Sequence, residues 1–524
     1  MTDGPGESAN RSDTPAEDSD RPLLESAVVA ASAGVAAVGG SYAAVGFTPA
    51  FVAAPVSDFV VASTPDAVIT WSIQTLGNLG SQLGFLLALA LTVGLFALTS
   101  AVGIALAARF EVPASPVVAV AGVAAALALT GAAASTLAAG ASAGLVAGLA
   151  SVGGGANRSD STVPGAPRRR VLQALAGAFA VGGTGAVLGS GRGDEIPAPD
   201  DGSVSADVES LLGEAEGRSL DVEGIEPLVS EQFYQVDINN VDPTVDRENW
   251  TLRVTGAVEE DVEFGYDEIA GMSESVEHRF VTLRCVGEGL NGKKMDTALW
   301  TGVPVTDLLD AAGIDTSGNC CVMLRAADDY FEEFPLSALR NGFLAFEMNG
   351  RRLPRSHGYP VRALIPGHWG EINVKWLTEI EVLEREAKGY WEKRGWHGTG
   401  PVNTVAKLHA VNHLDGGEIQ VGGHAYAGTR GIRKVEVSTD GGASWSEATL
   451  SDPLPAGTGE RGPSGGRAES AEDAWRQWEY TYEAAAPHEV VVRATDGEGT
   501  LQPSEESESF PSGPTGWVSR RVEP

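Results

Sequence analysis

The chain has little histidine and cysteine, and its N-terminal half has none of either. Only 8 His and 3 Cys occur among 524 residues, and the first of each are His278 and Cys285. The part of the chain before them therefore cannot ligate a haem through the usual axial residues. Basic residues are also scarce, because 36 Lys and Arg stand against 70 Asp and Glu, a formal net charge of −34. This excess of negative charge excludes nucleic-acid binding through bulk electrostatics.

Charged residues are absent from four long stretches near the N-terminus, 26–57, 67–108, 112–157 and 171–191. A membrane-spanning helix needs about 20 mostly apolar residues. The stretches have room for five such helices, since the third can hold two. Their abundant Ala and Gly would let the helices approach closely in lipid. We predict a transmembrane bundle within 26–191, with spans at 26–47, 83–108, 116–134, 136–154 and 171–190.

The orientation of the bundle follows from its cations. If the N-terminus is cytoplasmic, all seven basic residues that precede Arg192 fall in cytoplasmic segments, as the positive-inside rule requires. Five spans then place everything after them outside the cytoplasm. We therefore expect a multi-pass protein of the cell membrane with a cytoplasmic N-terminus and an extracytoplasmic C-terminal part.

The start of the last predicted span has two interpretations. Arg168 and Arg169 precede the weakly hydrophobic run "VLQALAGAFAVGGTGAVLGSG", as in twin-arginine signals, which export folded domains. The same arginines also fit a plain topology signal. The sequence alone leaves both interpretations open.

Two acidic segments flank the predicted spans. Residues 1–25 form an acidic N-terminal tail, and residues 192–226, rich in Gly, Pro and Ser, are expected to be an exposed linker. Only 7 of the 36 basic residues are Lys. An acidic, Lys-poor surface is typical of proteins kept soluble in concentrated salt, which screens repulsion among carboxylates. This indicates a halophilic source, with an ordinary acidic secreted protein as the alternative.

Two globular domains are expected beyond the linker. Residues 227–394 mix β-rich runs such as "WTLRVTGAV" with amphipathic helical stretches such as "VPVTDLLDAAGI", which indicates an α+β domain. Residues 395–524 contain alternating runs that end in Asp-Gly or Gly-Gly turns, which favours an immunoglobulin-like β-sandwich. Within it, residues 452–472 are expected to be a low-complexity loop.

The three cysteines occur in two settings. The pair Cys320–Cys321 is adjacent, and we expect burial in a strand and no bridge between them. Cys285 follows the strand "RFVTLR" and precedes a Gly-rich loop. Arg284, Lys293 and Lys294 lie near it in sequence and would stabilise a thiolate. A nucleophile, a soft metal ligand and a buried structural cysteine all remain open for Cys285 on these residues alone.

Several segments, in order, resemble a known family. "FYQVDINNVDPTVDRENWTLRVTGAVE", "VTLRCVGEGLNGKKMDTALWTGVPVTDLLDAAGI", "HGYPVRALIPGHWGEINVKWLTEIEVL" and "GYWEKRGWH" look like the molybdopterin-binding domain of the sulfite oxidase family. "GGHAYAGTRGIRKVEVSTDGGASW" is similar to the domain that follows it there and makes the dimer contact. Four motifs in the right order are a stronger signal than any one alone. The preceding spans resemble a membrane-anchored subgroup of that family.

The resemblance implies a site. Cys285 matches the position whose thiolate binds molybdenum, and soft sulfur ligation agrees with this. Tyr330 matches the tyrosine that lies over the metal. The remaining matches are to positions that hold the pterin and its phosphate: Tyr234, His357, Arg362, Asn373, Val374 and Lys375.

The sequence also departs from the family pattern. Animal and plant sulfite oxidases carry Arg in the segment equivalent to "FYQVDINN" and again after the metal-binding Cys, whereas this chain has Val236 and Asp237 in the first place and "EGLNGKK" in the second. An anion pocket of arginines is therefore not reproduced. Arg284, Lys293 and Lys294 are the candidate replacements, although Lys offers a point charge and no bidentate fork.

The resemblance implies an oxygen-atom transfer enzyme with a molybdenum-molybdopterin cofactor, acting on sulfite or a related small sulfur compound. No haem-binding domain is expected, so electrons would leave to a separate carrier or a membrane quinone. A homodimer through the C-terminal domain is implied as well. Two alternatives remain, a molybdenum reductase of methionine sulfoxide or other S-oxides or N-oxides, and a catalytically inactive, membrane-tethered binding protein that uses the immunoglobulin-like domain.

Overall fold

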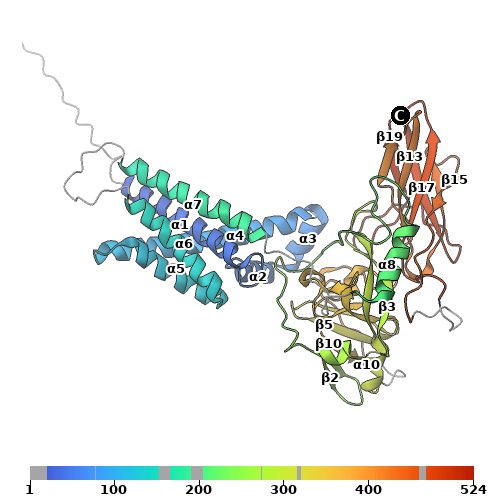
Figure 1. Ribbon diagram of the computed structural model, residues 1–524, viewed down its shortest axis with the longest axis horizontal. Coiled ribbons are helices and arrows are strands. Elements are labelled where there is room, and N and C mark those ends of the chain that lie inside the picture. Colours follow the sequence, from blue (N-terminus) through green and yellow to red (C-terminus); the bar gives the residue numbers. More distant parts are fainter. Residues whose placement is uncertain are drawn as a thin grey trace, which may run out of the picture. The chain divides into compact units, whose positions relative to one another are not determined.

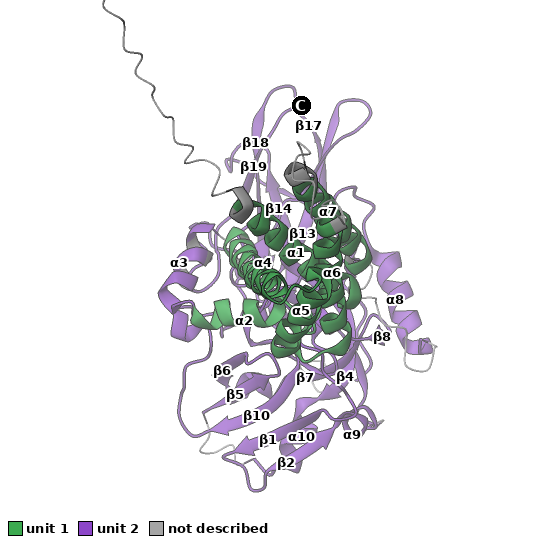
Figure 2. Cartoon of the chain, turned by 90° about the vertical axis from the view of Figure 1, so that its left-hand side faces the viewer, with its two compact units in different colours: residues 1–63, 78–193 green, residues 64–77, 194–524 purple. Residues whose placement is uncertain are grey.

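The computed structural model describes residues 21–76, 78–152, 166–190, 204–272, 274–314, 320–459 and 468–524. The predicted acidic tail up to Asp20, Arg158 and the start of the predicted linker lie outside these residues. The chain divides into two compact units, residues 1–63 with 78–193 and residues 64–77 with 194–524 (Figure 2). We call them unit 1 and unit 2.

Unit 1 is helical in its described part. Its helices are α1 Arg21–Val45, α2 Ala54–Ser63, α4 Asn78–Arg109, α5 Ala114–Thr130, α6 Ala133–Val152 and α7 Ala166–Ser190 (Figure 1). Glycines allow the helices to lie close together. A Cβ on Gly39 of α1 would lie 2.8 Å from the Cα of Gly182 in α7, and one on Gly122 of α5 would lie 3.1 Å from the Cα of Gly140 in α6. Small residues at such crossings are typical of helices packed in a membrane.

Four helices of unit 1 are long and apolar enough to cross a membrane, over 24–45, 82–109, 133–151 and 170–189. They correspond to four of the five predicted spans. The remaining predicted span, 116–134, forms α5, which has only 17 residues. By length and composition the described residues thus give four clear candidates and two shorter apolar helices, α2 and α5.

The predicted α+β domain is present in unit 2. Its first sheet has the order β2-β1-β10-β5-β6, and only β1 and β10 run parallel among these neighbours. These strands are β1 Thr251–Gly256, β2 Val262–Gly265, β5 Cys321–Ala326, β6 Phe331–Pro335 and β10 Leu377–Leu383. The second sheet comprises β3 Glu277–Arg284, β4 Met295–Pro304, β7 Phe343–Met348, β8 Arg351–Arg352 and β9 Arg362–Leu364. Short helices accompany them, α9 Tyr266–Ala270, α10 Val305–Ala311 and α11 Leu336–Leu339.

The predicted C-terminal β-sandwich is also present. One sheet contains β11 Val405–Ala406, β12 Ala410–His413, β13 Glu418–Tyr426, β16 Thr449–Leu450 and β17 Arg476–Glu483, and the other contains β14 Ile432–Ser438, β15 Ser446–Glu447, β18 His488–Asp496 and β19 Val518–Val522. Inward-facing side chains of the two sheets, among them Val421, Trp478, Val435 and Val492, share one apolar core. This is the two-layer packing of an immunoglobulin-like fold.

Part of the predicted linker is an ordered helix, which corrects the expectation of an exposed segment. Helix α8, Ala206–Arg218, begins at Ser205, whose hydroxyl accepts a hydrogen bond from the Val208 amide. Val208, Leu211 and Ala215 are buried, and they join a core cluster that also contains Trp475. The apolar face was hidden in the composition because the other faces of the helix are acidic.

The adjacent cysteines also differ from expectation. Cys320 and Cys321 form a disulfide at the start of β5, so the prediction that they do not bridge is wrong. Cys321 is buried but Cys320 is exposed. Sequence spacing alone could not reveal this, because a bridge between neighbours depends on the local backbone conformation.

Candidate active site

Cys285 is the first residue after β3, at the start of a loop that returns to β4. Its amide donates a hydrogen bond of 3.0 Å to the Lys294 carbonyl, which closes the loop. Cys285 is free and only partly exposed. The strand therefore delivers a single unbridged thiol to the edge of the second sheet.

Burial raises the pKa of the Cys285 thiol, and this effect outweighs the neighbouring charges. Lys294 lowers the pKa and Glu288 raises it. Of the cations expected to stabilise the thiolate, Lys294 thus acts in the predicted direction, although burial has the larger effect. A thiol that holds its proton is a weak nucleophile, whereas a bound metal ion displaces the proton of a ligating thiol. The site thus favours metal ligation over nucleophilic catalysis.

Tyr234 lies close to Cys285. Its amide donates a hydrogen bond of 2.8 Å to Asp296, and its ring stacks on Phe233 with centroids 5.5 Å apart. A Cβ on Gly370 would lie 2.8 Å from the Tyr234 hydroxyl, so only glycine admits the tyrosine there. Burial raises the pKa of Tyr234 well above its usual value, and the negative charge of the Cys285 thiolate adds to the rise.

His357, Arg362, Asn373 and Lys375 come together around two short helices, η1 Arg355–His357 and η2 Gly370–Ile372. Arg362 donates hydrogen bonds to the carbonyls of His357 at 3.2 Å and Asn373 at 3.0 Å. Lys375 donates one of 2.8 Å to the carbonyl of Ser356. The structure therefore assembles residues that are up to 18 positions apart in the predicted motifs into one cationic pocket.

This pocket suits an anionic group. Buried Arg362 Nε and Ser356 Oγ have no hydrogen-bond partner among the described residues. Burial lowers the pKa of Arg362 to about 10. Burial, Arg362 and Lys375 together lower the pKa of His357 to about 3, which keeps that imidazole neutral. Unpaired donors and excess positive charge are what a phosphate requires, so the residues fit the phosphate-bearing pterin of the family.

Asn373 and Val374 fix the backbone of the segment that carries Lys375. The Asn373 side chain accepts from the Ile365 amide at 2.7 Å and donates to the Trp369 carbonyl at 2.8 Å. Val374 is buried, and its carbonyl accepts from the Ala363 amide at 2.8 Å. Both residues therefore hold the segment that carries Lys375 in place.

Asp237 lies where the family pattern has an arginine, and it forms an ion pair with Lys375. This carboxylate partly offsets the positive charge of Lys375. This position therefore holds a carboxylate paired with Lys375, whereas the sequence offered Arg284, Lys293 and Lys294 as replacements for the missing arginines.

The three candidate anion-binding cations differ in setting. Arg284 is fully buried, donates to Glu288 at 2.9 Å and lies over the Trp369 ring at 4.8 Å. Lys293 is exposed and Lys294 is partly exposed. Glu288 is shared with Lys407, and Arg284 Nη2 is buried without a hydrogen-bond partner among the described residues, so Arg284 and the two lysines all remain candidate contacts for the substrate anion.

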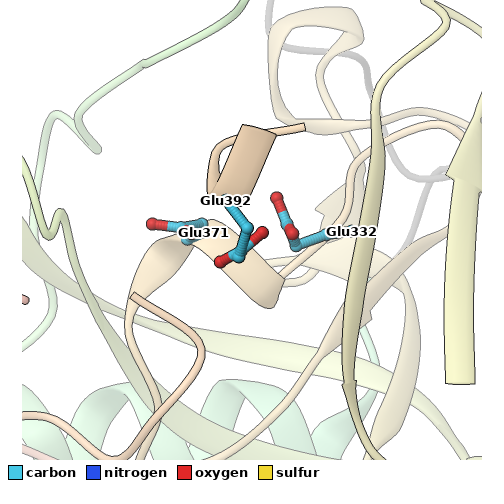
Figure 3. Close-up of side chains that lie close together, drawn as sticks. All are labelled: Glu332, Glu371 and Glu392. Carbon is cyan, nitrogen blue, oxygen red and sulfur yellow. The ribbon is translucent and has the colours of Figure 1, made fainter. Parts of the chain in front are cut away.

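Tyr330 precedes β6, and it lies beside three carboxyl groups that sequence reasoning missed. Its hydroxyl contacts Glu332 Oε2 at 3.0 Å and donates to the Glu371 carbonyl at 2.8 Å. Glu332, Glu371 and Glu392 lie side by side (Figure 3). Burial raises the pKa of Glu332 to about 11, and the neighbouring Glu392 adds to the rise. Glu371 and Glu392 lie within the segments that resemble the sulfite oxidase family. Their acidic side chains were the sequence signal that could have indicated this cluster.

A groove of about 860 Å³ reaches Tyr330 from the side of β1, β5 and β10. Its walls include Trp250, Arg325 and Phe331. Of the predicted site residues in the described part of the chain, it contacts Tyr330 alone. The groove is therefore separate from the cationic pocket around Arg362.

Comparisons with known proteins agree with this geometry. The model of the oxidoreductase molybdopterin binding domain matches residues 239–391. The model of the Mo-co oxidoreductase dimerisation domain matches residues 401–511. Together with the site, these matches define a molybdopterin-dependent oxidoreductase whose cofactor is molybdenum-molybdopterin.

Curated relatives place the chain more narrowly. It is 27% identical over 317 residues to mitochondrial sulfite oxidase of Mus musculus, covering 50% of this chain and 54% of that protein. It is 31% identical over 244 residues to sulfite oxidase of Gallus gallus, covering 40% and 50%. The chain belongs to the sulfite oxidase family of molybdopterin-dependent oxidoreductases. It spans about half the length of these relatives, and the apolar helices of unit 1 lie outside the matched family domains.

Among solved structures, the sulfane dehydrogenase SoxCD from Paracoccus pantotrophus matches with a TM-score of 0.47 and 18% identity, covering 58% of this chain and 82% of that chain.

Proposed function

We propose that this chain is a membrane-anchored, extracytoplasmic oxidoreductase that transfers an oxygen atom to sulfite or a related small sulfur compound and passes the electrons to a separate acceptor. The observation that carries the proposal is the free Cys285 at the end of β3, next to Tyr234 and the cationic pocket of Arg362 and Lys375. One soft ligand beside a phosphate-binding pocket is the arrangement that a metal-pterin cofactor needs.

The protein's own residues have distinct tasks in this proposal. Bound molybdenum-molybdopterin would supply the two-electron redox and oxygen-transfer chemistry. Cys285 would ligate the metal, and Arg362, Lys375 and neutral His357 would hold the pterin and its phosphate. Tyr330 keeps its proton at neutral pH, since burial raises its pKa well above the usual value. It can therefore donate a hydrogen bond to a developing negative charge on the substrate oxygen.

The substrate is proposed to be a small sulfur oxyanion, steered by Lys293 and Lys294. Purified protein should reduce an artificial acceptor when sulfite is added and should not oxidise a reduced dye when methionine sulfoxide is added. The opposite pattern would establish the reductase alternative. An acceptor in the membrane, such as a quinone, would account for the anchored form.

Metal analysis tests the centre itself. Wild-type full-length protein in detergent should contain molybdenum and pterin, and Cys285→Ala should lose both most of its molybdenum and its sulfite-dependent activity. The double variant Cys320→Ser/Cys321→Ser is the matched cysteine control and should keep its molybdenum. Full activity in Cys285→Ala, or no molybdenum in wild type, would remove the basis for the proposal and leave the binding-protein alternative.

A connection within unit 2 supports five membrane crossings. Helix α3, Asp66–Leu76, lies between the first two predicted spans in sequence but belongs to unit 2, where Asp66 pairs with Arg394 at 2.8 Å. On this proposal the segment before α4 and the catalytic domain share one side of the membrane. An even number of the helices α4, α5, α6 and α7 would then cross, so α5 would cross with the other three. Its 17 residues are at the lower limit of about 17 to 25 for a span.

The orientation is proposed from the cations, with the catalytic domain outside the cytoplasm. Replacing Arg168 and Arg169 with Lys should keep the domain in the cytoplasm if the folded domain is exported by a twin-arginine route. Protease accessibility in spheroplasts reports the location. Normal export of the Lys variant would leave the arginines as a topology signal, because Lys serves the positive-inside rule equally well.

A homodimer through residues 395–524 is proposed from the match to a dimerisation domain. The mass of the detergent-purified protein, measured by light scattering, tests it. A monomer at all concentrations would contradict it.

A further inference from the structure

Three buried carboxyl groups meet next to Tyr330 and belong to three separate segments. Glu332 lies in β6, Glu371 in η2, and Glu392 begins η3, Glu392–Arg394 (Figure 3). One oxygen atom of each lies within 4.8 Å of an oxygen atom of the other two. Glu332 is 0% exposed and Glu371 is 8% exposed. Acidic side chains this deeply buried require a compensating positive charge or bound protons.

The cluster has no cationic side chain to compensate it. In the described part of the chain, no Lys or Arg forms an ion pair with any of the three. The two cations next in sequence to Glu392 are directed elsewhere: Lys393 lies over the Phe331 ring at 4.1 Å, and Arg394 is directed to Asp66 and to the Tyr390 carbonyl.

The carboxyl oxygens also lack hydrogen-bond donors. Both oxygens of Glu371 and both of Glu392 are buried without a hydrogen-bond partner among the described residues. Glu332 accepts from the amides of Glu333 and Trp391, and it contacts the Tyr330 hydroxyl, whose proton goes to the Glu371 carbonyl. Glu371 is more than nine-tenths buried and adjacent to the other two carboxyl groups. The nearby Gly398 amide lowers its pKa, but neither of its oxygens has a hydrogen bond of full geometry among the described residues, so both face the cluster.

We propose that Glu332, Glu371 and Glu392 bind one divalent cation of the calcium type, separate from molybdenum. Oxygen ligands only, without sulfur or nitrogen, select a hard cation. Calcium binds oxygens at about 2.3 to 2.6 Å, so ligands of one ion are at most about 4.6 to 5.2 Å apart, and the three oxygens, which all lie within 4.8 Å of one another, are close enough to share one ion.

The cation has a structural consequence for Tyr330. It ties β6, η2 and η3 together at the point where the Tyr330 hydroxyl contacts Glu332 and the Glu371 carbonyl. The ion therefore acts on Tyr330 through these two glutamates, and they are positioning residues. The site does not rest on the proposed oxidase activity, since its ligands are distinct from Cys285 and the cationic pocket.

The test uses the full-length protein in detergent and concentrated KCl, which suppresses weak binding to the acidic surface. Elemental analysis of wild type should find one divalent ion per chain besides molybdenum. After removal of the ion with EDTA, calcium should raise the temperature of unfolding. Glu371→Gln and Glu392→Gln should weaken calcium binding about tenfold or more. Glu384→Gln is the matched control, because Glu384 is exposed and lies between η2 and η3 in sequence. This variant should bind calcium as wild type does.

The sign of the stability change separates a cation from shared protons. In EDTA, Glu371→Gln should unfold at a higher temperature than wild type, because one repelling carboxyl group is gone. In calcium it should unfold at a lower temperature than wild type, because a ligand is gone. A wild-type protein without the extra ion and without a calcium-dependent shift, or variants that keep the full shift, would show that the carboxyl groups share protons instead. None of these measurements requires enzyme activity. They therefore test the cation site independently of the proposed oxidase function.

Discussion

Lys407 of the C-terminal domain donates a hydrogen bond of 2.6 Å to Glu288, in the loop that follows Cys285. Both side chains are at most 1% exposed. Arg284 donates to the same carboxylate at 2.9 Å, and the Lys294 amide donates to its other oxygen at 2.9 Å. One buried carboxylate therefore connects the loop of the predicted molybdenum ligand to the β-sandwich.

Replacing Glu288 should destabilise the protein strongly. Glu288→Gln leaves Arg284 and Lys407 buried without a counter-charge, and breaking such a network costs about 3 to 5 kcal/mol. We expect a lower unfolding temperature and loss of molybdenum from the purified protein. The control is Glu379→Gln, whose partners Arg253 and Arg325 are largely exposed, and it should cost less than about 1 kcal/mol. Equal losses of stability in both variants would mean that the buried network contributes no more to stability than the exposed ion pairs.

Removing the Tyr330 hydroxyl should slow catalysis without loss of molybdenum. Tyr330→Phe keeps the ring but loses the donor to the substrate oxygen, and removal of such a donor lowers kcat by about 10² to 10³. The molybdenum content should stay at the wild-type level. Tyr390→Phe is the control, because Tyr390 packs against Tyr330 with ring centroids 5.6 Å apart. An unchanged kcat in Tyr330→Phe would exclude the tyrosine from the reaction.

Acid should destabilise the protein through buried histidines. His424 stacks on Trp475 at 3.9 Å, and burial followed by the charge of His409 lowers its pKa from 6.5 to about 3. Between these values the unfolded chain binds a proton that the folded protein does not bind, so stability falls as the pH drops below 6.5. This side chain contributes up to about 1.4 kcal/mol per pH unit in that window.

His424→Phe keeps the stacking and removes the titrating group. The variant should therefore lose less stability than wild type when unfolding midpoints at pH 7 and pH 5 are compared. His413→Phe, at an exposed position, should behave like wild type. A wild-type slope in His424→Phe would assign the acid sensitivity to other groups.

The helical unit should depend on close contact between glycines. Gly39→Leu places a side chain where the Cα of Gly182 lies 2.8 Å from the position of the new Cβ, so α1 and α7 must move apart. We expect a lower yield of folded protein in the membrane. Gly94→Leu in α4 is the control, since nothing lies within 4 Å of its Cβ position. Similar yields for the two variants would show that α1 and α7 do not need this contact.

The sequence alone was sufficient for features that depend on local pattern. Charge-free apolar runs predicted four helices that are long and apolar enough to cross a membrane, where each helix would satisfy its own backbone. Alternation with turn residues predicted the β-sandwich, and ordered motifs predicted the family and the cofactor. The pattern did not predict α8, because the apolar face formed by Val208, Leu211 and Ala215 is diluted by acidic neighbours.

Only the tertiary structure decided which charges meet. Glu332, Glu371 and Glu392 are up to 60 positions apart in sequence, and Lys407 is 119 positions from Glu288, so no spacing rule could pair them. Burial also outweighs the expected effect of Lys294 on the pKa of Cys285, because removing a thiolate from water costs more free energy than the nearby cation offsets. Ordinary sequence patterns report neighbours along a helix or strand, whereas electrostatics depends on distance through space and on exclusion of water.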